Sequence, residues 1–259
     1  MKPVKAIFFD VDGTLLDTKS HVVPPSTIET LKILKQKGYK IAIATGRNFE
    51  ACQQTGITEM IEWDGYVTSN GQQLYDAQQQ CFYHYVMDPH VIRKIEAIVI
   101  EDDINVQFKG QPDFMRFEPD ESVKISHEFF KLPIPSLAKA YEGEDVDMIL
   151  VYAPKGYDYQ KFMNLEGTLV MPGESHYADI VSSSHSKYTG IRQMLERWQL
   201  PLSYVAFGDS LNDMEMFRHA DLSVAMGNGN ASLKEIATLT TRSVLEDGIY
   251  LACKELNLI

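Results

Sequence analysis

The sequence predicts an α/β fold: a doubly wound parallel sheet into which a second, α+β domain is inserted. Short apolar runs alternate with helix-like segments in residues 1–79, the alternation is lost in residues 80–184, and it returns in residues 185–259. Strands that alternate with helices are typical of βαβ units and of a parallel sheet. We therefore expect a core domain built from residues 1–79 and 185–259, and an inserted domain of residues 80–184.

The first segment contains three expected strands. The apolar runs at residues 4–9 and 41–45 have the length and composition of strands that are buried on both faces of a parallel sheet. Between them, the S-x-x-E capping box that begins at Ser26 predicts the start of a helix. A short helix is expected from about Asn48, and residues 66–68 are expected to form the third strand.

The inserted segment lacks the regular alternation of strands and helices. Strand-like runs cover residues 81–86, 104–109 and 148–152, and residues 89–101 form one long helix-like stretch. This mixture indicates an α+β domain rather than further βαβ units.

The alternation of strands and helices resumes after Ser186. Four apolar residues at helical spacing predict a helix, namely Ile191, Met194, Leu195 and Trp198. Strands are expected at residues 204–207 and 222–225. A helix should follow each of them, the first from about Asn212 and the second capped by Asn230.

Composition limits the class of partner. The chain has 259 residues, with 24 Lys+Arg against 36 Asp+Glu, a net charge of −12 and a pI near 5.0. Nucleic acids and anionic membranes require a basic face, so neither is an expected partner. No apolar run approaches the roughly 18 residues of a membrane helix. The three cysteines are widely spaced and read as reduced thiols, which favours a cytoplasmic protein, either a monomer or a small homo-oligomer.

Two carboxylates follow the first strand. Asp10 and Asp12 lie at a carboxyl end of the expected sheet, where α/β proteins bind ligands, and Gly13 lets the chain turn. Two such carboxylates can bind one divalent cation. An EF-hand loop would need Gly at its sixth position, whereas here Gly is the fourth residue counted from Asp10. A solvated turn without function is the remaining alternative.

Three further elements lie after strands or before a helix. Asp209, after residues 204–207, can complete a metal site, and Asn212 and Asp213 begin the next helix, where Asn212 can equally be a helix cap. The Thr45-Gly46-Arg47 turn can form an anion nest, or can be only a turn. Lys187 is either a surface lysine or a cation for a phosphoryl group.

In this order, the four elements resemble the motifs of the haloacid dehalogenase superfamily of aspartate-nucleophile phosphatases. Residues 10–14 match D-x-D-G-[TS], Thr45 and Lys187 match the second and third motifs, and residues 208–213 match G-D-x-x-N-D. The Thr45-Gly46-Arg47 turn and the large insert are similar to the Cof-type branch. The resemblance implies a Rossmann-like core and an inserted α/β cap domain that sets substrate specificity.

The resemblance also implies roles for these residues. Asp10 would be the nucleophile that forms an aspartyl phosphate, and Asp12 would be the general acid and base. Mg²⁺ would bind Asp10, the carbonyl or side chain of Asp12, and Asp209, while Asp213 would orient this group or reach the metal through water. The phosphoryl oxygens would be held by several residues, namely Lys187, Thr45, Arg47, Asn212 and the N–H groups of Val11 and Gly46. Asn70 and Gly71 would either contact substrate or form a turn.

We therefore expect a Mg²⁺-dependent phosphatase of small phosphorylated metabolites. Sugar phosphates are the first expected substrates. The net charge of residues 80–184 is −9, which either disfavours a polyanionic substrate and favours a neutral sugar, or is only a well-solvated surface. Phosphorylated cofactors such as pyridoxal phosphate or flavin mononucleotide come second. The alternative is a phospho-accepting or metabolite-sensing module with little turnover, although such a module has no need of a general acid at Asp12. A phosphotransferase or mutase would share the first step.

Overall fold

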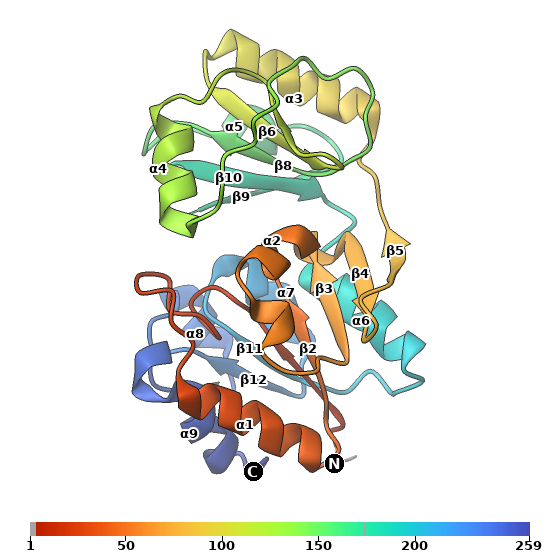
Figure 1. The fold of residues 1–259 in the computed structure, drawn as a ribbon, viewed down its shortest axis with the longest axis vertical. Helices are drawn as coiled ribbons and strands as arrows, with labels where there is room; N and C mark the ends of the chain where they lie inside the picture. Colours follow the sequence, from red (N-terminus) through yellow and green to blue (C-terminus); the bar gives the residue numbers. More distant parts are fainter. Residues whose placement is uncertain (1–3, 174) are drawn as a thin grey trace. The chain divides into compact units, whose positions relative to one another are not determined.

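The computed structural model describes residues 4–173 and 175–259 and divides the chain into two compact units. The first unit contains the chain up to Tyr83 and again from Ser186 onward, and the second unit runs from His84 to His185 (Figure 1). We describe each unit by itself. No helix among the described residues is long and apolar enough to cross a membrane.

The first unit is built on an eight-stranded sheet with the order β13-β12-β11-β1-β2-β3-β4-β5. All pairs from β13 to β3 are parallel, and β4 pairs antiparallel with β3. From β1 the chain first extends the sheet through β2 and β3, and later extends it on the other side of β1 through β11, β12 and β13. This reversal is the topological switch point, where doubly wound sheets bind ligands. The strands are β1 (Ala6–Phe9), β2 (Lys40–Ala44), β3 (Gly65–Thr68), β4 (Gln73–Asp76), β5 (Cys81–His84), β11 (Val205–Gly208), β12 (Leu222–Ala225) and β13 (Leu239–Thr240).

Helices cover both faces of this sheet because its central strands are apolar on both sides. On β1, Ile7 and Phe9 pack with α1, α2 and α9, whereas Ala6 and Phe8 pack with α6, α7 and α8. The doubly wound α/β prediction is therefore confirmed. The helices are α1 (Pro25–Gln36), α2 (Phe49–Gln54), α6 (Lys187–Arg197), α7 (Met214–His219), α8 (Ala231–Ile236) and α9 (Gly248–Glu255).

The second unit has its own five-stranded sheet, with the order β7-β6-β8-β10-β9 and antiparallel pairing throughout. One face packs against α3 and α5, and the other packs against α4. The unit therefore has a separate α+β core. Its elements are α3 (Pro89–Glu101), β6 (Asn105–Gly110), β7 (Phe114–Met115), α4 (Glu121–Phe130), β8 (Val146–Tyr152), α5 (Gln160–Met163), β9 (Thr168–Pro172) and β10 (Tyr177–Ser182).

Two local predictions were wrong. The capping box does not begin α1: Pro24 is the N-cap, Pro25 is the first helical residue, and the Ser26 hydroxyl donates to the Asp247 carboxylate instead. Proline starts a helix readily because its φ is already helical and its missing N–H needs no partner. The run at residues 81–86 contributes β5 to the core sheet rather than a strand to the inserted domain.

Candidate active site

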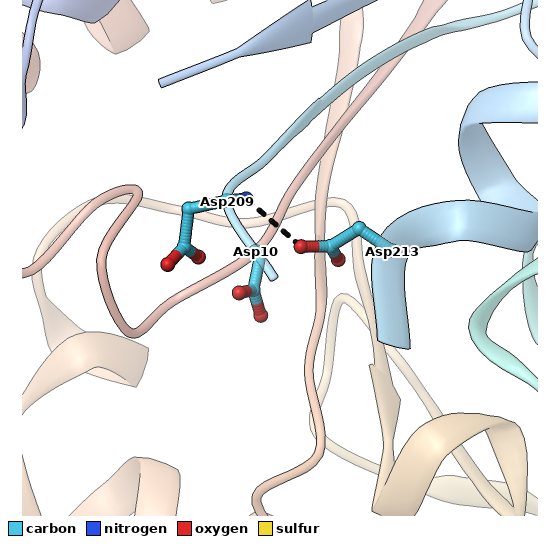
Figure 2. Close-up of side chains that lie close together, drawn as sticks. All are labelled: Asp10, Asp209 and Asp213. Atoms are coloured by element: carbon cyan, nitrogen blue, oxygen red, sulfur yellow. Dashed lines mark hydrogen bonds between the residues drawn. The ribbon is translucent and has the colours of Figure 1, made fainter. Parts of the chain in front are cut away.

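Three aspartates meet at the switch point. Asp10 follows β1, and Asp209 and Asp213 follow β11; each has a carboxylate oxygen within 4.8 Å of one on the other two (Figure 2). The parallel pairing of β1 with β11 continues to the backbone N–H of Asp10, which donates to the Phe207 carbonyl at 3.0 Å. The topology therefore places Asp10 beside two carboxylates that lie 199 and 203 positions further along the sequence.

The Asp213 carboxylate fixes the loop that carries Asp209. Its Oδ2 atom accepts hydrogen bonds from the backbone N–H groups of Asp209 at 2.9 Å and Ser210 at 3.0 Å. Figure 2 shows the first of these bonds. Its other oxygen, Oδ1, accepts from Lys187 at 2.7 Å. Asp213 is fully buried, so its side chain is held from two directions.

Lys187 is the cation of the cluster and is completely buried. It is the first residue of α6, whose N-cap Ser186 closes a capping box with Thr189. Its Nζ atom lies 2.8 Å from Asp10 Oδ1, 2.7 Å from Asp213 Oδ1 and 3.1 Å from Asn212 Oδ1. All three ammonium hydrogens therefore have acceptors, and the surface-lysine reading is wrong.

The electrostatics of the cluster favour an additional cation. Burial raises the pKa of Asp10 to about 7, although attraction by Lys187 opposes the shift. Burial, followed by repulsion from Asp10, raises the pKa of Asp209 well above its usual value. Burial alone would lower the pKa of Lys187, but the two neighbouring carboxylates raise it. Three carboxylates with one ammonium group, which contacts two of them, offer hard oxygen ligands and excess negative charge, and this suits a divalent ion.

The Asp12 side chain is not part of the three-carboxylate cluster, so the backbone carbonyl of Asp12 is the alternative that agrees better with this geometry. Its Oδ2 and Oδ1 atoms accept hydrogen bonds from Arg47 Nε and Nη2, both at 2.7 Å. The Arg47 side chain is thereby turned toward Asp12, and its Nη1 atom is buried without a partner among the described residues, so it can still donate to an anion. A planar guanidinium matches a carboxylate in this two-bond geometry, which is why the pair forms.

The predicted anion nest lies beside the cluster. Thr45 is buried, and its Oγ1 atom accepts the backbone N–H of Arg47 at 3.1 Å. Gly46 is half-buried. Within the described chain, the backbone N–H groups of Gly46 and Val11 donate to no other residue. These two N–H groups can therefore donate to an anion.

Asn70 and Gly71 lie in a single turn, Ser69–Gly71, after β3. Asn70 is almost fully buried, and its Oδ1 atom accepts from Asn212 Nδ2 at 3.2 Å. A Cβ atom on Gly71 would lie 2.1 Å from the carbonyl oxygen of Ser186, so only glycine fits there. The turn therefore packs against the start of α6, next to Lys187.

Sequence reasoning missed a contribution from Asn228. The Gly-Asn-Gly triplet at residues 227–229 reads as an ordinary turn, but Asn228 Nδ2 donates to the carbonyl of Gly13 at 2.7 Å. Its Oδ1 atom accepts from the N–H of Val244 at 3.2 Å. Asn228 thus fixes the turn that follows Asp12. Only its place after a parallel strand at the same sheet edge could have indicated this.

Comparison with known proteins agrees with this geometry. The family model for haloacid dehalogenase-like hydrolases matches residues 7–252. YkrA of Bacillus subtilis (strain 168), provisionally named a phosphatase, is 30% identical over 98% of each chain. YitU of the same organism, named a 5-amino-6-(5-phospho-D-ribitylamino)uracil phosphatase, is 28% identical over 96% of each chain.

Solved structures match over nearly the whole chain. A subclass IIB sugar phosphatase, BT4131, superposes with a TM-score of 0.88 at 26% identity and covers 99% of this chain and 100% of its own. The phosphatase BT1666 from Bacteroides thetaiotaomicron has a TM-score of 0.87 at 26% identity, covering 99% of this chain and 96% of its own. The fold and these relatives define the protein as a phosphoric monoester hydrolase. The chain belongs to the haloacid dehalogenase-like hydrolase family, in its Cof-type branch.

Proposed function

We propose that this protein hydrolyses phosphate monoesters of small metabolites through an aspartyl phosphate on Asp10. The observation that carries the proposal is the 2.8 Å contact of Asp10 Oδ1 with Lys187 Nζ inside a buried cluster of three carboxylates. It combines a nucleophile, a cation and a set of metal-binding oxygens at one strand end. An activated carboxylate nucleophile splits hydrolysis into two easier displacements.

The metal that suits this site best is Mg²⁺. Asp10, Asp209 and the backbone carbonyl of Asp12 would hold it, because the Asp12 side chain is engaged with Arg47. Asp213 would keep the Asp209 loop in place. When bound, the ion offsets the repulsion between an anionic nucleophile and an anionic phosphoryl group.

The chain's own residues account for each bond change. An Asp10 oxygen attacks phosphorus and the bond from phosphorus to the ester oxygen breaks. Asp12, once its carboxyl group has left Arg47 and taken up a proton, donates that proton to the ester oxygen. Asp12 then takes a proton from a water molecule that attacks phosphorus, and the bond between phosphorus and Asp10 breaks to release phosphate. The free N–H groups of Val11 and Gly46, with the Thr45 hydroxyl, would hold the phosphoryl oxygens.

Sugar phosphates are the substrates we propose first, and pyridoxal phosphate or flavin mononucleotide second. Support comes from the sugar phosphatase neighbour and from the relative named for a ribityl phosphate substrate. We assign specificity to the inserted unit, His84–His185, which holds most of the protein's net negative charge. That charge favours a leaving group without a charge of its own.

A panel of small phosphate esters tests the proposal. We expect Mg²⁺-dependent phosphate release that is strongest for sugar phosphates, with Asp10→Asn as the blank. Asp145→Asn is a matched control, because Asp145 is an exposed carboxylate of the inserted unit. Release that is equal in the wild type and in Asp10→Asn would exclude the mechanism, and strongest release from a phosphorylated cofactor would correct the substrate class.

Removing the metal should affect stability in a pH-dependent way. In metal-free protein the pKa of Asp10 is about 7 against an unperturbed 3.8, so the folded state binds more protons between these values. The free energy of unfolding of EDTA-treated protein should therefore fall as pH rises through this window. Because Mg²⁺ binds the ionised carboxylates, it should raise Tm more at about pH 8 than at about pH 5.

Thermal melts with and without excess Mg²⁺ at the two pH values measure this effect. Asp209→Asn should reduce the response to Mg²⁺, and Asp145→Asn should keep it. An equal rise in Tm at both pH values would contradict a metal site on these carboxylates. In the same samples, EDTA should abolish phosphate release and Mg²⁺ should restore it.

A further inference from the structure

The turn Ser69–Gly71 has an unusual backbone. Ser69, Asn70 and Gly71 all have positive φ, at 48°, 51° and 93°. Such values are unfavourable for residues that carry a Cβ atom, and serine is not among the residues that adopt them readily. The turn is nevertheless fully enclosed and hydrogen-bonded: the N–H groups of Ser69 and Asn70 donate to the carbonyls of Arg47 and Thr45 at 2.8 and 3.0 Å.

Matching hydrogen-bond donors to acceptors fixes the orientation of two side-chain amides, those of Asn212 and Asn70. Lys187 has only donors, so the atom of Asn212 that faces it at 3.1 Å must be the oxygen. The Asn212 nitrogen then faces Asn70, and the Asn70 atom that meets it at 3.2 Å must also be an oxygen. This leaves Asn70 Nδ2 buried without a partner in the described chain.

Neither the positive φ values of this turn nor the unpartnered Asn70 Nδ2 atom stabilises the folded protein. Buried donors without partners are rare, and strained backbone persists where the surrounding structure holds it in place. In this turn the Asn70 oxygen contacts the nitrogen of the Asn212 amide, whose oxygen contacts Lys187. A chain of contacts therefore runs from Asn70 through Asn212 to the ammonium group beside the Asp10 carboxylate.

We propose that Asn70 is a positioning residue that acts through Asn212 on Lys187. The inference rests on the proposed function, because it assigns Asn70 to the same reaction without giving it a contact with substrate. The Asn212 amide is held at both ends, because Asn70 accepts from its Nδ2 atom and the Ser210 hydroxyl donates to its Oδ1 atom at 2.7 Å. Without the Asn70 acceptor, the amide is held through its oxygen alone, so the position of that oxygen against Lys187, and of the ammonium group against Asp10, becomes less precise.

Asn70→Gly tests the role, with Ser69→Gly as the matched control. Both variants place glycine at a position of positive φ in the same turn, but only Asn70→Gly removes the acceptor for Asn212. We expect Asn70→Gly to lower kcat by roughly tenfold to a hundredfold, the loss that a small misplacement of a reacting group produces. Ser69→Gly should stay within about twofold of wild type, because the Ser69 hydroxyl has no partner in the described chain.

A double-mutant cycle separates positioning from general disruption. In an Asn212→Ala background, Asn70→Gly should cause no further loss of kcat, because the residue through which it acts is gone. Losses that multiply, or equal losses for Asn70→Gly and Ser69→Gly, would overturn the inference.

The same cycle measured on Tm distinguishes this inference from the proposed function. Absence of phosphate release that depends on Asp10 would refute the function, and the Tm cycle would still decide the inference. We expect Asn70→Gly to change Tm less in the Asn212→Ala background than in wild type. Fully additive changes in Tm would show that the two amides are not coupled and would overturn the proposal.

Discussion

Asp10→Asn is expected to lower phosphate release by about 10⁴-fold or more while the protein stays folded. The amide is not a nucleophile, so no aspartyl phosphate can form. It has nearly the volume of the carboxylate, and its Oδ1 atom can still accept from Lys187, which lies 2.8 Å away. It also removes one of three crowded negative charges. Steady-state rates on the best substrate measure the loss, and circular dichroism with thermal melts reports the fold.

The control for this experiment is Asp145→Asn, which makes the same chemical change at an exposed position of the inserted unit. It should keep near-wild-type activity. An Asp10→Asn protein that is folded and retains more than about a tenth of wild-type activity would contradict the nucleophile assignment. A variant that is unfolded would instead show that the negative charge of Asp10 beside Lys187 is a structural requirement.

The fold could be predicted because the sequence carries the periodicity that produces it. Runs such as Ile41–Ala44 are apolar at every position, which only a strand covered on both faces requires. The edge strand β5 could not be assigned in this way. Its residues are exposed or half-buried, so they carry little of the burial signal, and their sheet is decided by pairing. Its assignment therefore needed the three-dimensional structure.

The residues at the candidate site could be located because strand ends in one parallel sheet share an edge. The hydrogen bonds that these residues make could not be predicted in this way. The bidentate pair of Asp12 with Arg47 joins residues 35 positions apart, and the bond from Asn228 to Gly13 spans 215 positions. Side-chain rotamers and loop conformation decide such contacts, and neither appears in a motif. Ser69 is an example of an unpredictable loop conformation: its φ is positive, and a serine in the sequence does not indicate a positive φ as a glycine does.

Lys187→Met should damage both stability and activity. Lys187 is completely buried between Asp10 and Asp213, so its loss leaves two buried carboxylates without their cation. Removing one partner of a buried ion pair typically costs about 3–5 kcal/mol, and we expect a loss of this order in the free energy of unfolding near neutral pH. Activity should fall at the same time, because no other ammonium group lies beside the nucleophile among the described residues.

The pH dependence identifies the cause of this destabilisation. Without Lys187, the folded-state pKa of Asp10 rises further above its unfolded value, so the penalty is present at neutral pH and shrinks as pH falls. Denaturant unfolding of EDTA-treated protein at about pH 7 and about pH 5 should therefore show a smaller gap from wild type at the lower pH. Lys32→Met, at an exposed position of α1, should show almost no gap at either pH. A gap for Lys187→Met that does not change with pH would mean that lost packing, rather than uncompensated charge, destabilises the variant.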